Sequence, residues 1–304
     1  MIRSTGKMAV GDKVSGRWPA VSRFVRVLAP VLLFLWPFVG IRQGVDIGDT
    51  TYALANYVYI DRIDPMWLLA TWLPNVCGSL ITHLPGGGSL FGVRLWCTPV
   101  ICATALIAWF ATERLFRDKE GGTPVLFLVR FAGIWIAEGL CWCPVVILYN
   151  YLTYLFLTLA SVFLLFGFAR TLSDDTLTLR RGGWYLAAGI CLGLNLFVRF
   201  PNIVEVLLIL AVWFHEGRIA AKKQGLSAAG ILARCAKATG ICVLGFIPGV
   251  IIPLVIISIR YGFDAYPRMI AGLFSMTEGA SDYTLSGMLF DTLRAYTASA
   301  VEML

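Results

Sequence analysis

The chain has 304 residues, of which 58% are hydrophobic and only 14% are charged, and its mean hydropathy is +0.77. A soluble domain has about 45–50% apolar and about 25% charged residues, so this composition excludes a soluble globular protein. Apolar runs such as "VFLLFGF" do not alternate with polar residues, which disfavours a transmembrane β-barrel and predicts an all-α, polytopic bundle of spanning helices. The net charge of +7 does not predict a nucleic-acid partner, because basic cytoplasmic loops account for such an excess in membrane proteins.

Apolar segments long enough to enter a bilayer recur along the whole chain. The first follows a basic region, residues 1–24, and the sequence after it does not look like a signal-peptide cleavage site. We expect about seven spans, at 25–41, 91–112, 123–141, 144–168, 184–200, 201–214 and 238–259. A transmembrane domain then covers 25–259 and includes an outer loop at 42–90, and a second outer segment with short helices, 260–304, ends the chain.

Four basic segments predict the orientation of these spans. They lie at 1–26, 113–120, 169–182 and 215–237 and hold most of the 25 Lys and Arg residues. All four lie on one side if the chain crosses the bilayer once before residue 90, and by the positive-inside rule that side is the cytoplasm. The apolar stretch 66–84 would break this pattern if it crossed, so we expect an interfacial helix on the outer surface there. The sequence therefore predicts a multi-pass protein of the plasma (inner) membrane with a cytoplasmic N-terminus.

Patterns for metals, nucleotides and disulfides are weak in this sequence. Most of the eight cysteines fall inside apolar runs and are expected to be small buried hydrophobes rather than disulfides or zinc ligands. Neither D-x-D nor H-E-x-x-H occurs, so the sequence predicts no metal site and leaves a divalent-metal requirement open. The glycine-rich "LPGGGSL" lacks the lysine of a phosphate-binding loop, and we expect a flexible turn.

The outer loop opens with "GVDIGDTTYALANYVYID", in which Asp46 and Asp49 are three residues apart and a helix is expected to begin near Asp49. One interpretation is structural: Asp49 or Thr50 caps this helix, where the dipole favours a carboxylate. The other is catalytic: a carboxylate held at a helix start acts as general base and takes a proton from an acceptor hydroxyl. Both interpretations place the acid on the outer side of the membrane.

Arg199, in "LFVRFPN", is expected at the outer end of the fifth span, before a tight hairpin at Pro201 and Asn202. Its side chain either snorkels to lipid headgroups or binds the phosphate of a lipid-linked substrate, because a guanidinium matches phosphate oxygens. Glu138 and Glu205 are expected at the outer ends of other spans, where either pairs with Arg199.

Tyr149 and Asn150 are expected a turn or two inside the fourth span, where they either hydrogen-bond between helices or line a substrate cavity. The residues that we consider candidates for substrate binding are Tyr52, Asn56, Glu138, Tyr149, Asn150, Arg199 and Asn202.

This layout resembles the GT-C superfamily of integral membrane glycosyltransferases, which use polyprenyl-phosphate sugars. The resemblance is carried by the acids and "TTYALANY" after the first span, by the interfacial stretch and by the basic cytoplasmic turns. In addition, "GICLGLNLFVRFPN" is similar to the glycine-rich span that ends in an arginine in protein-mannosyltransferase-like and aminoarabinose-transferase-like members. The resemblance implies a GT-C-like fold with Asp49, or else Asp46, as catalytic base and with Arg199 on the donor phosphate. The family's adjacent Asp-Glu pair is replaced here by Gly48-Asp49.

The function that this resemblance implies is transfer of a hexosyl or pentosyl group from a polyprenyl-phosphate donor to a lipid, glycan or protein acceptor on the extracytoplasmic face. The partners are then membrane lipids and the lipid-linked sugar phosphate, with no further cofactor implied. One alternative is a transporter or lipid flippase, which is typically built from internal repeats and broken helices that meet at midplane. Another is a non-catalytic, truncated chain, because members of the family continue with more spans than are seen before the final "AYTASAVEML".

Overall fold

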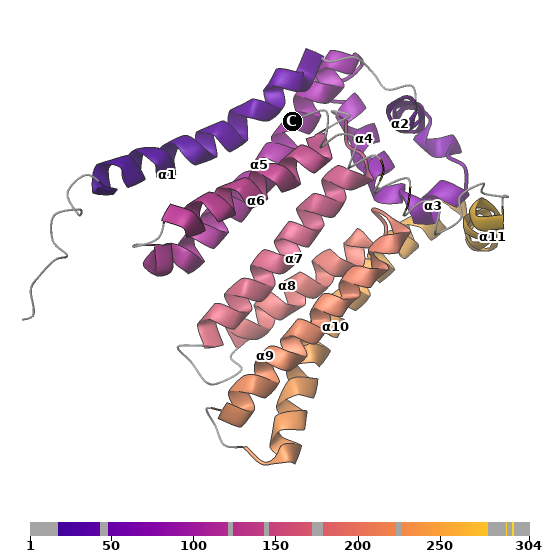
Figure 1. Cartoon of the computed structure of the whole chain (residues 1–304). Helices are drawn as coiled ribbons and strands as arrows, with labels where there is room; N and C mark the ends of the chain where they lie inside the picture. Colours follow the sequence, from indigo (N-terminus) through magenta and orange to yellow (C-terminus); the bar gives the residue numbers. More distant parts are fainter. Residues whose placement is uncertain are drawn as a thin grey trace, which may run out of the picture.

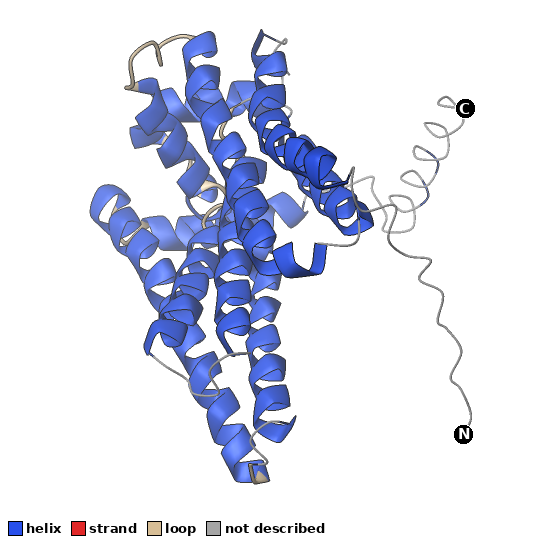
Figure 2. Cartoon of the chain, turned by 90° about the vertical axis from the view of Figure 1, so that its left-hand side faces the viewer, coloured by secondary structure: helices blue, strands red, loops and turns tan. Residues whose placement is uncertain are grey.

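The computed structural model describes residues 18–42, 48–120, 124–142, 146–171, 179–222 and 226–278, together with residues 290 and 294. The basic region before residue 18 and most of the segment after residue 278 lie outside this described part. Every regular element within it is a helix, and no strand occurs there (Figure 2). The expectation of an all-helical chain is therefore confirmed for these residues.

The long helices pack against their neighbours in one bundle, and shorter helices gather at one end of it (Figure 1). The long helices are α1 (Trp18–Leu35), α5 (Leu90–Glu120), α6 (Pro124–Trp142), α7 (Tyr149–Thr171), α8 (Leu179–Asn195), α9 (Leu208–Lys222) and α10 (Ala228–Tyr261). The shorter elements are η1 (Trp36–Arg42), α2 (Asp49–Val58), η2 (Ile60–Arg62), α3 (Met66–Ala70), α4 (Trp72–Thr82), η3 (Phe200–Leu207) and α11 (Ala265–Glu278).

Three of the described helices are long and apolar enough to cross a bilayer, namely Leu90–Leu115, Tyr149–Ala169 and Ala228–Tyr261. A spanning helix needs roughly 20 residues. The stretch 66–84 instead forms two short helices of 5 and 11 residues. As expected, it does not form one spanning helix.

The connection between α8 and α9 differs from the expected hairpin. The fifth span was expected to continue to residue 200, but α8 ends at Asn195, and Pro201 and Asn202 lie in the 3-10 helix η3. Proline suits the start of a helix, because the N–H that it lacks would have no intrahelical acceptor there. Arg199 consequently lies beyond the end of α8, on the connection itself.

Glycines allow α8 and α10 to approach each other closely. Gly193 of α8 lies against Gly249 of α10, so that a Cβ added at Gly193 would be only 2.9 Å from the Cα of Gly249. One turn away, a Cβ added at Gly245 would overlap the carbonyl oxygen of Leu186. Small residues four positions apart permit this kind of contact between membrane helices. The seam fixes α8, and with it the point at which the chain leaves α8 toward Arg199.

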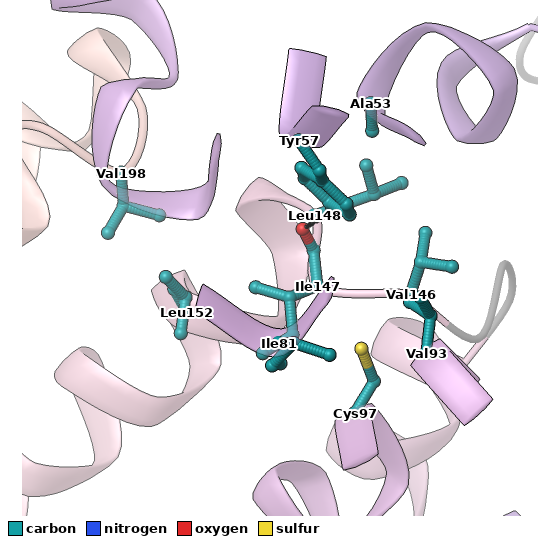
Figure 3. Close-up of a cluster of buried hydrophobic side chains, with 10 residues drawn as sticks. All are labelled: Ala53, Tyr57, Ile81, Val93, Cys97, Val146, Ile147, Leu148, Leu152 and Val198. Carbon is teal, nitrogen blue, oxygen red and sulfur yellow. Dashed lines mark hydrogen bonds between the residues drawn. The ribbon is translucent and has the colours of Figure 1, made fainter. Parts of the chain in front are cut away.

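A hydrophobic cluster anchors the short helix α2 to the long helices (Figure 3). Tyr57 of α2 is buried, and its hydroxyl donates a hydrogen bond to the carbonyl oxygen of Ile147, just before α7. Helix α4 passes so close that a Cβ added at Gly78 would overlap the ring of Tyr57. Cys97 of α5 lies beneath the same connection (Figure 3). As a result, α2 is held against the chain that leads into α7.

The end of α10 is tied to the same group of short helices. The Nε of Arg260 lies 3.0 Å from Oδ1 of Asp61 in η2, and the hydroxyl of Tyr261 donates to the carbonyl of Ile60 at 2.8 Å. The adjacent ends of α9 and α10, at Lys222 and Ala228, lie at the opposite end of the bundle (Figure 1). The two ends of the bundle are therefore chemically and structurally distinct.

Candidate functional site

Three of the candidate residues from the sequence meet where the short helices gather. The hydroxyl of Tyr149 donates a hydrogen bond of 2.8 Å to Oδ2 of Asp49. The guanidinium carbon of Arg199 lies 4.7 Å from the centroid of the Tyr149 ring. Asp49 is the first residue of α2, Tyr149 is the first residue of α7, and Arg199 immediately precedes η3. The side chain of Tyr149 therefore contacts both the carboxylate of Asp49 and the guanidinium of Arg199.

The position of Asp49 follows from the start of α2. The helix begins at Asp49 as expected, but its N-cap is Gly48 and no side chain caps it. The expectation that Asp49 or Thr50 caps the helix is therefore wrong: the Thr50 side chain is buried, and the Asp49 carboxylate accepts from Tyr149 instead. A carboxylate in the first turn is still favoured by the helix dipole. Asp49 is exposed, so its carboxylate is accessible from outside the protein.

Arg199 is held in an extended conformation, with φ −158° and ψ 124°, and it is exposed. Its guanidinium lies against the face of Tyr149, a favourable cation–π arrangement. The expected pairing with a glutamate is wrong, since Glu205 accepts from Asn195 and Glu138 accepts from Trp36. Among the described residues, no carboxylate lies within ion-pair distance of Arg199. Its N–H donors are therefore available to an anion.

An amide network holds the chain on either side of Arg199. Nδ2 of Asn202 donates to Oγ1 of Thr153 on α7 at 2.7 Å and lies 3.2 Å from both the carbonyl and the side-chain oxygen of Asn195. Asn195 is fully buried at the end of α8 and donates to Glu205 of η3. We therefore assign Asn202, a candidate for substrate binding, a positioning role.

Asn195 is not among the residues expected from the sequence, although a polar residue inside an apolar span is a functional signal. Thr153 was missed as well, because nothing in the apolar run that contains it distinguishes it from a helix-packing threonine.

Tyr52 and Asn56 border the site on α2. The ring centroid of Tyr52 lies 4.9 Å from that of Trp67 in α3. Burial raises the pKa of Tyr52. Residues three or four apart on a helix are neighbours, so Tyr52 lies one turn after Asp49 on α2, and Asn56 lies one turn further along.

The remaining candidates lie elsewhere or outside the described residues. Glu138 is fully buried in α6, where one carboxylate oxygen accepts from Trp36 at 2.6 Å; within the described chain it contacts none of the three central residues. Asn150 is half-buried, directly after Tyr149. Tyr149 and Asn150 were expected a turn or two inside a span, but α7 begins only at Tyr149. The preceding residues 146–148 are non-helical and are buried in the Tyr57 cluster. Asp46 lies outside the described residues.

Within the described ranges, no three His, Cys, Asp or Glu side chains come together as metal ligands. The free thiols are Cys77, Cys97, Cys102, Cys191, Cys235 and Cys242. No protein-family model, curated protein or solved structure matches the chain. The geometry of the site therefore carries the functional argument by itself.

Proposed function

We propose that the chain is an integral membrane glycosyltransferase that moves a sugar from a polyprenyl-phosphate donor to a lipid, glycan or protein acceptor on the extracytoplasmic face. The observation that carries this proposal is the placement of Asp49 and Arg199 on the same tyrosine, Tyr149. Transfer from a lipid phosphate needs a base for the acceptor and a cation for the leaving group. Both lie here at the end of the long helices.

In the proposed arrangement, all seven long helices cross the membrane, in a GT-C-like layout. The other four long helices lie alongside the three that are long and apolar enough to cross a bilayer (Figure 1). The N-terminus is then cytoplasmic by the positive-inside rule, and the short helices α2, α3 and α4 lie on the outer surface. This orientation places Arg199 and Asp49 where a lipid-linked donor presents its phosphate.

The proposed reaction is an inverting displacement at the anomeric carbon. Oδ1 of Asp49 takes the proton of the acceptor hydroxyl or amine while the acceptor atom bonds to the sugar. The bond between the sugar and the phosphate oxygen breaks, and the polyprenyl phosphate leaves with the electron pair. Arg199 stabilises the negative charge on that phosphate, and Tyr149, which donates to Oδ2, keeps Oδ1 of Asp49 turned toward the acceptor.

The test is transfer of label from radiolabelled polyprenyl-phosphate sugars by the purified chain in lipid vesicles. We expect Asp49→Asn to lower the rate by about 10²–10⁴, the usual contribution of general base catalysis. Asp264→Asn is the matched control, because Asp264 is also an exposed acid and is paired with Arg268 at 2.7 Å. It should leave the rate unchanged.

A second pair of variants tests the phosphate role. Arg199→Gln should lower the rate by about 10²–10³, as loss of one charge-stabilising donor does, and Arg268→Gln should not. An Asp49→Asn variant that transfers sugar at the wild-type rate refutes the proposal. So does a wild-type chain that moves the donor lipid between leaflets without transfer, which favours a flippase. Addition of EDTA to the same reactions measures the metal requirement.

A further inference from the structure

Several described basic residues gather at the end of the bundle opposite the candidate site. There Glu216 of α9 is fully buried and forms ion pairs with Arg181 of α8 and with Arg234 of α10. The Nε of Arg234 lies 2.9 Å from Oε2 of Glu216, and the hydroxyl of Tyr185 donates to Oε1 at 2.7 Å. One carboxylate therefore forms ion pairs with two guanidiniums, and this cluster joins α8, α9 and α10.

A pocket opens between α9 and α10 beside this cluster. Its walls include Trp213, Phe214 and Leu232, and Arg218 lines it as well. Phe214 is 71% exposed and Leu232 is 57% exposed, so two large apolar side chains are uncovered next to a cation. Gly217 forms part of the floor, where an added Cβ would lie 3.3 Å from the sulfur of Cys235.

The charge around this pocket favours an anionic occupant. Arg218 is exposed, and no carboxylate in the described chain lies within ion-pair distance of it. Lys237, one helical turn beyond Arg234 on α10, is exposed as well. Basic pockets between membrane helices bind anionic lipid headgroups, and long apolar side chains next to them suit an acyl chain.

We propose that this pocket binds an anionic phospholipid of the surrounding membrane, with the phosphate on Arg218 and an acyl chain along Phe214 and Leu232. A second copy of the chain is a poorer occupant. A symmetric contact places the same patch on both partners and would bring Arg218 and Lys237 close to their own copies. The lipid site does not depend on sugar transfer, because it lies at the other end of the helices.

The test is retention of lipid by the full chain, measured by native mass spectrometry after transfer from micelles that contain phosphatidylglycerol or phosphatidylcholine. Wild type should retain phosphatidylglycerol preferentially. Arg218→Gln should weaken that retention roughly fivefold, since one basic residue near a membrane surface contributes about 1 kcal/mol. Arg114→Gln, which removes an exposed arginine near the end of α5, should retain the lipid like wild type.

A variant that fills the pocket without changing its charge separates the remaining outcomes. Ala228 is exposed and lines the pocket, so Ala228→Phe should displace the acyl chain and reduce retention while light scattering shows an unchanged oligomeric state. Equal retention of the two lipids by wild type overturns the proposal, as does equal retention by Arg218→Gln and Arg114→Gln. If Ala228→Phe changes the oligomeric state and leaves lipid retention unchanged, the surface belongs to a second copy and the proposal is wrong.

Discussion

Replacement of Tyr57 by phenylalanine tests the contact that places α2 against α7. Tyr57 is 1% exposed, and its hydroxyl donates to the carbonyl oxygen of Ile147. Burial raises the pKa of Tyr57 well above its usual value, so the hydroxyl remains a protonated donor throughout the neutral pH range. The substitution removes one oxygen and keeps the ring that packs against Gly78.

The expected cost follows from what the variant leaves behind. The carbonyl of Ile147 stays buried and loses this donor, and an unsatisfied buried polar group costs about 1–3 kcal/mol. Because the ring is retained, the loss of apolar burial and the added cavity are negligible. We therefore expect Tyr57→Phe to lower the free energy of unfolding by about 1–3 kcal/mol.

The measurement is equilibrium unfolding in mixed micelles with increasing SDS, followed by tryptophan fluorescence. Tyr59→Phe, at the residue directly after α2, is the control, because Tyr59 is 63% exposed and a surface substitution of this kind changes stability by about 0.5 kcal/mol or less. If both variants unfold at the same SDS concentration, the hydrogen bond to Ile147 does not hold α2 in place.

Three further predictions use the same unfolding assay or a simple labelling experiment. Gly245→Ala should lower the free energy of unfolding by about 1–3 kcal/mol, because the added methyl group overpacks against α8. Gly240→Ala is its control and should be neutral or stabilising, since an added Cβ there meets nothing within 4 Å. Equal effects of the two variants would contradict the close contact between α8 and α10. Glu216→Gln removes the carboxylate shared by two buried arginines and should cost about 3–5 kcal/mol, against little change for Glu113→Gln on α5. Burial raises the pKa of Cys77 to about 11, so at pH 8 its thiolate fraction is about 10⁻³ and maleimide should modify it about 100-fold more slowly than N-acetylcysteine. Comparable rates, measured by peptide mass spectrometry, would show that this thiol is accessible and ionised.

The helical architecture is readable from the sequence because hydropathy acts on each segment separately. The conflict of the stretch 66–84 with the charge pattern correctly indicated that it is not one spanning helix, and the break between α3 and α4 lies at Thr71. The start of α2 at Asp49 was also predicted from the local sequence alone. The G-x-x-x-G patterns of α8 and α10 are also readable, but they do not specify which helix each one contacts.

The contacts within the candidate site depend on tertiary packing, which cannot be inferred from each segment of the sequence taken separately. Tyr149 joins Asp49 to Arg199 only because α7 starts later than hydropathy predicts, after the buried stretch 146–148. Glu138 looked equivalent to Glu205 in the sequence, since both were expected near outer helix ends. Packing separates them, because Glu138 pairs with Trp36 while Glu205 joins the amide network near Arg199.

The anchoring of α2 on residues far along the chain has a consequence for biosynthesis. Tyr57 and Ile147 are 90 positions apart, and Asp49 and Tyr149 are 100 apart. At about 5–20 residues per second, roughly 5–20 s pass between synthesis of Tyr57 and synthesis of Ile147, whose carbonyl accepts its hydrogen bond. The site is completed later still, when Arg199 has been translated. A ribosome stalled between α7 and α8 therefore leaves a chain in which Asp49 is in place but Arg199 is missing.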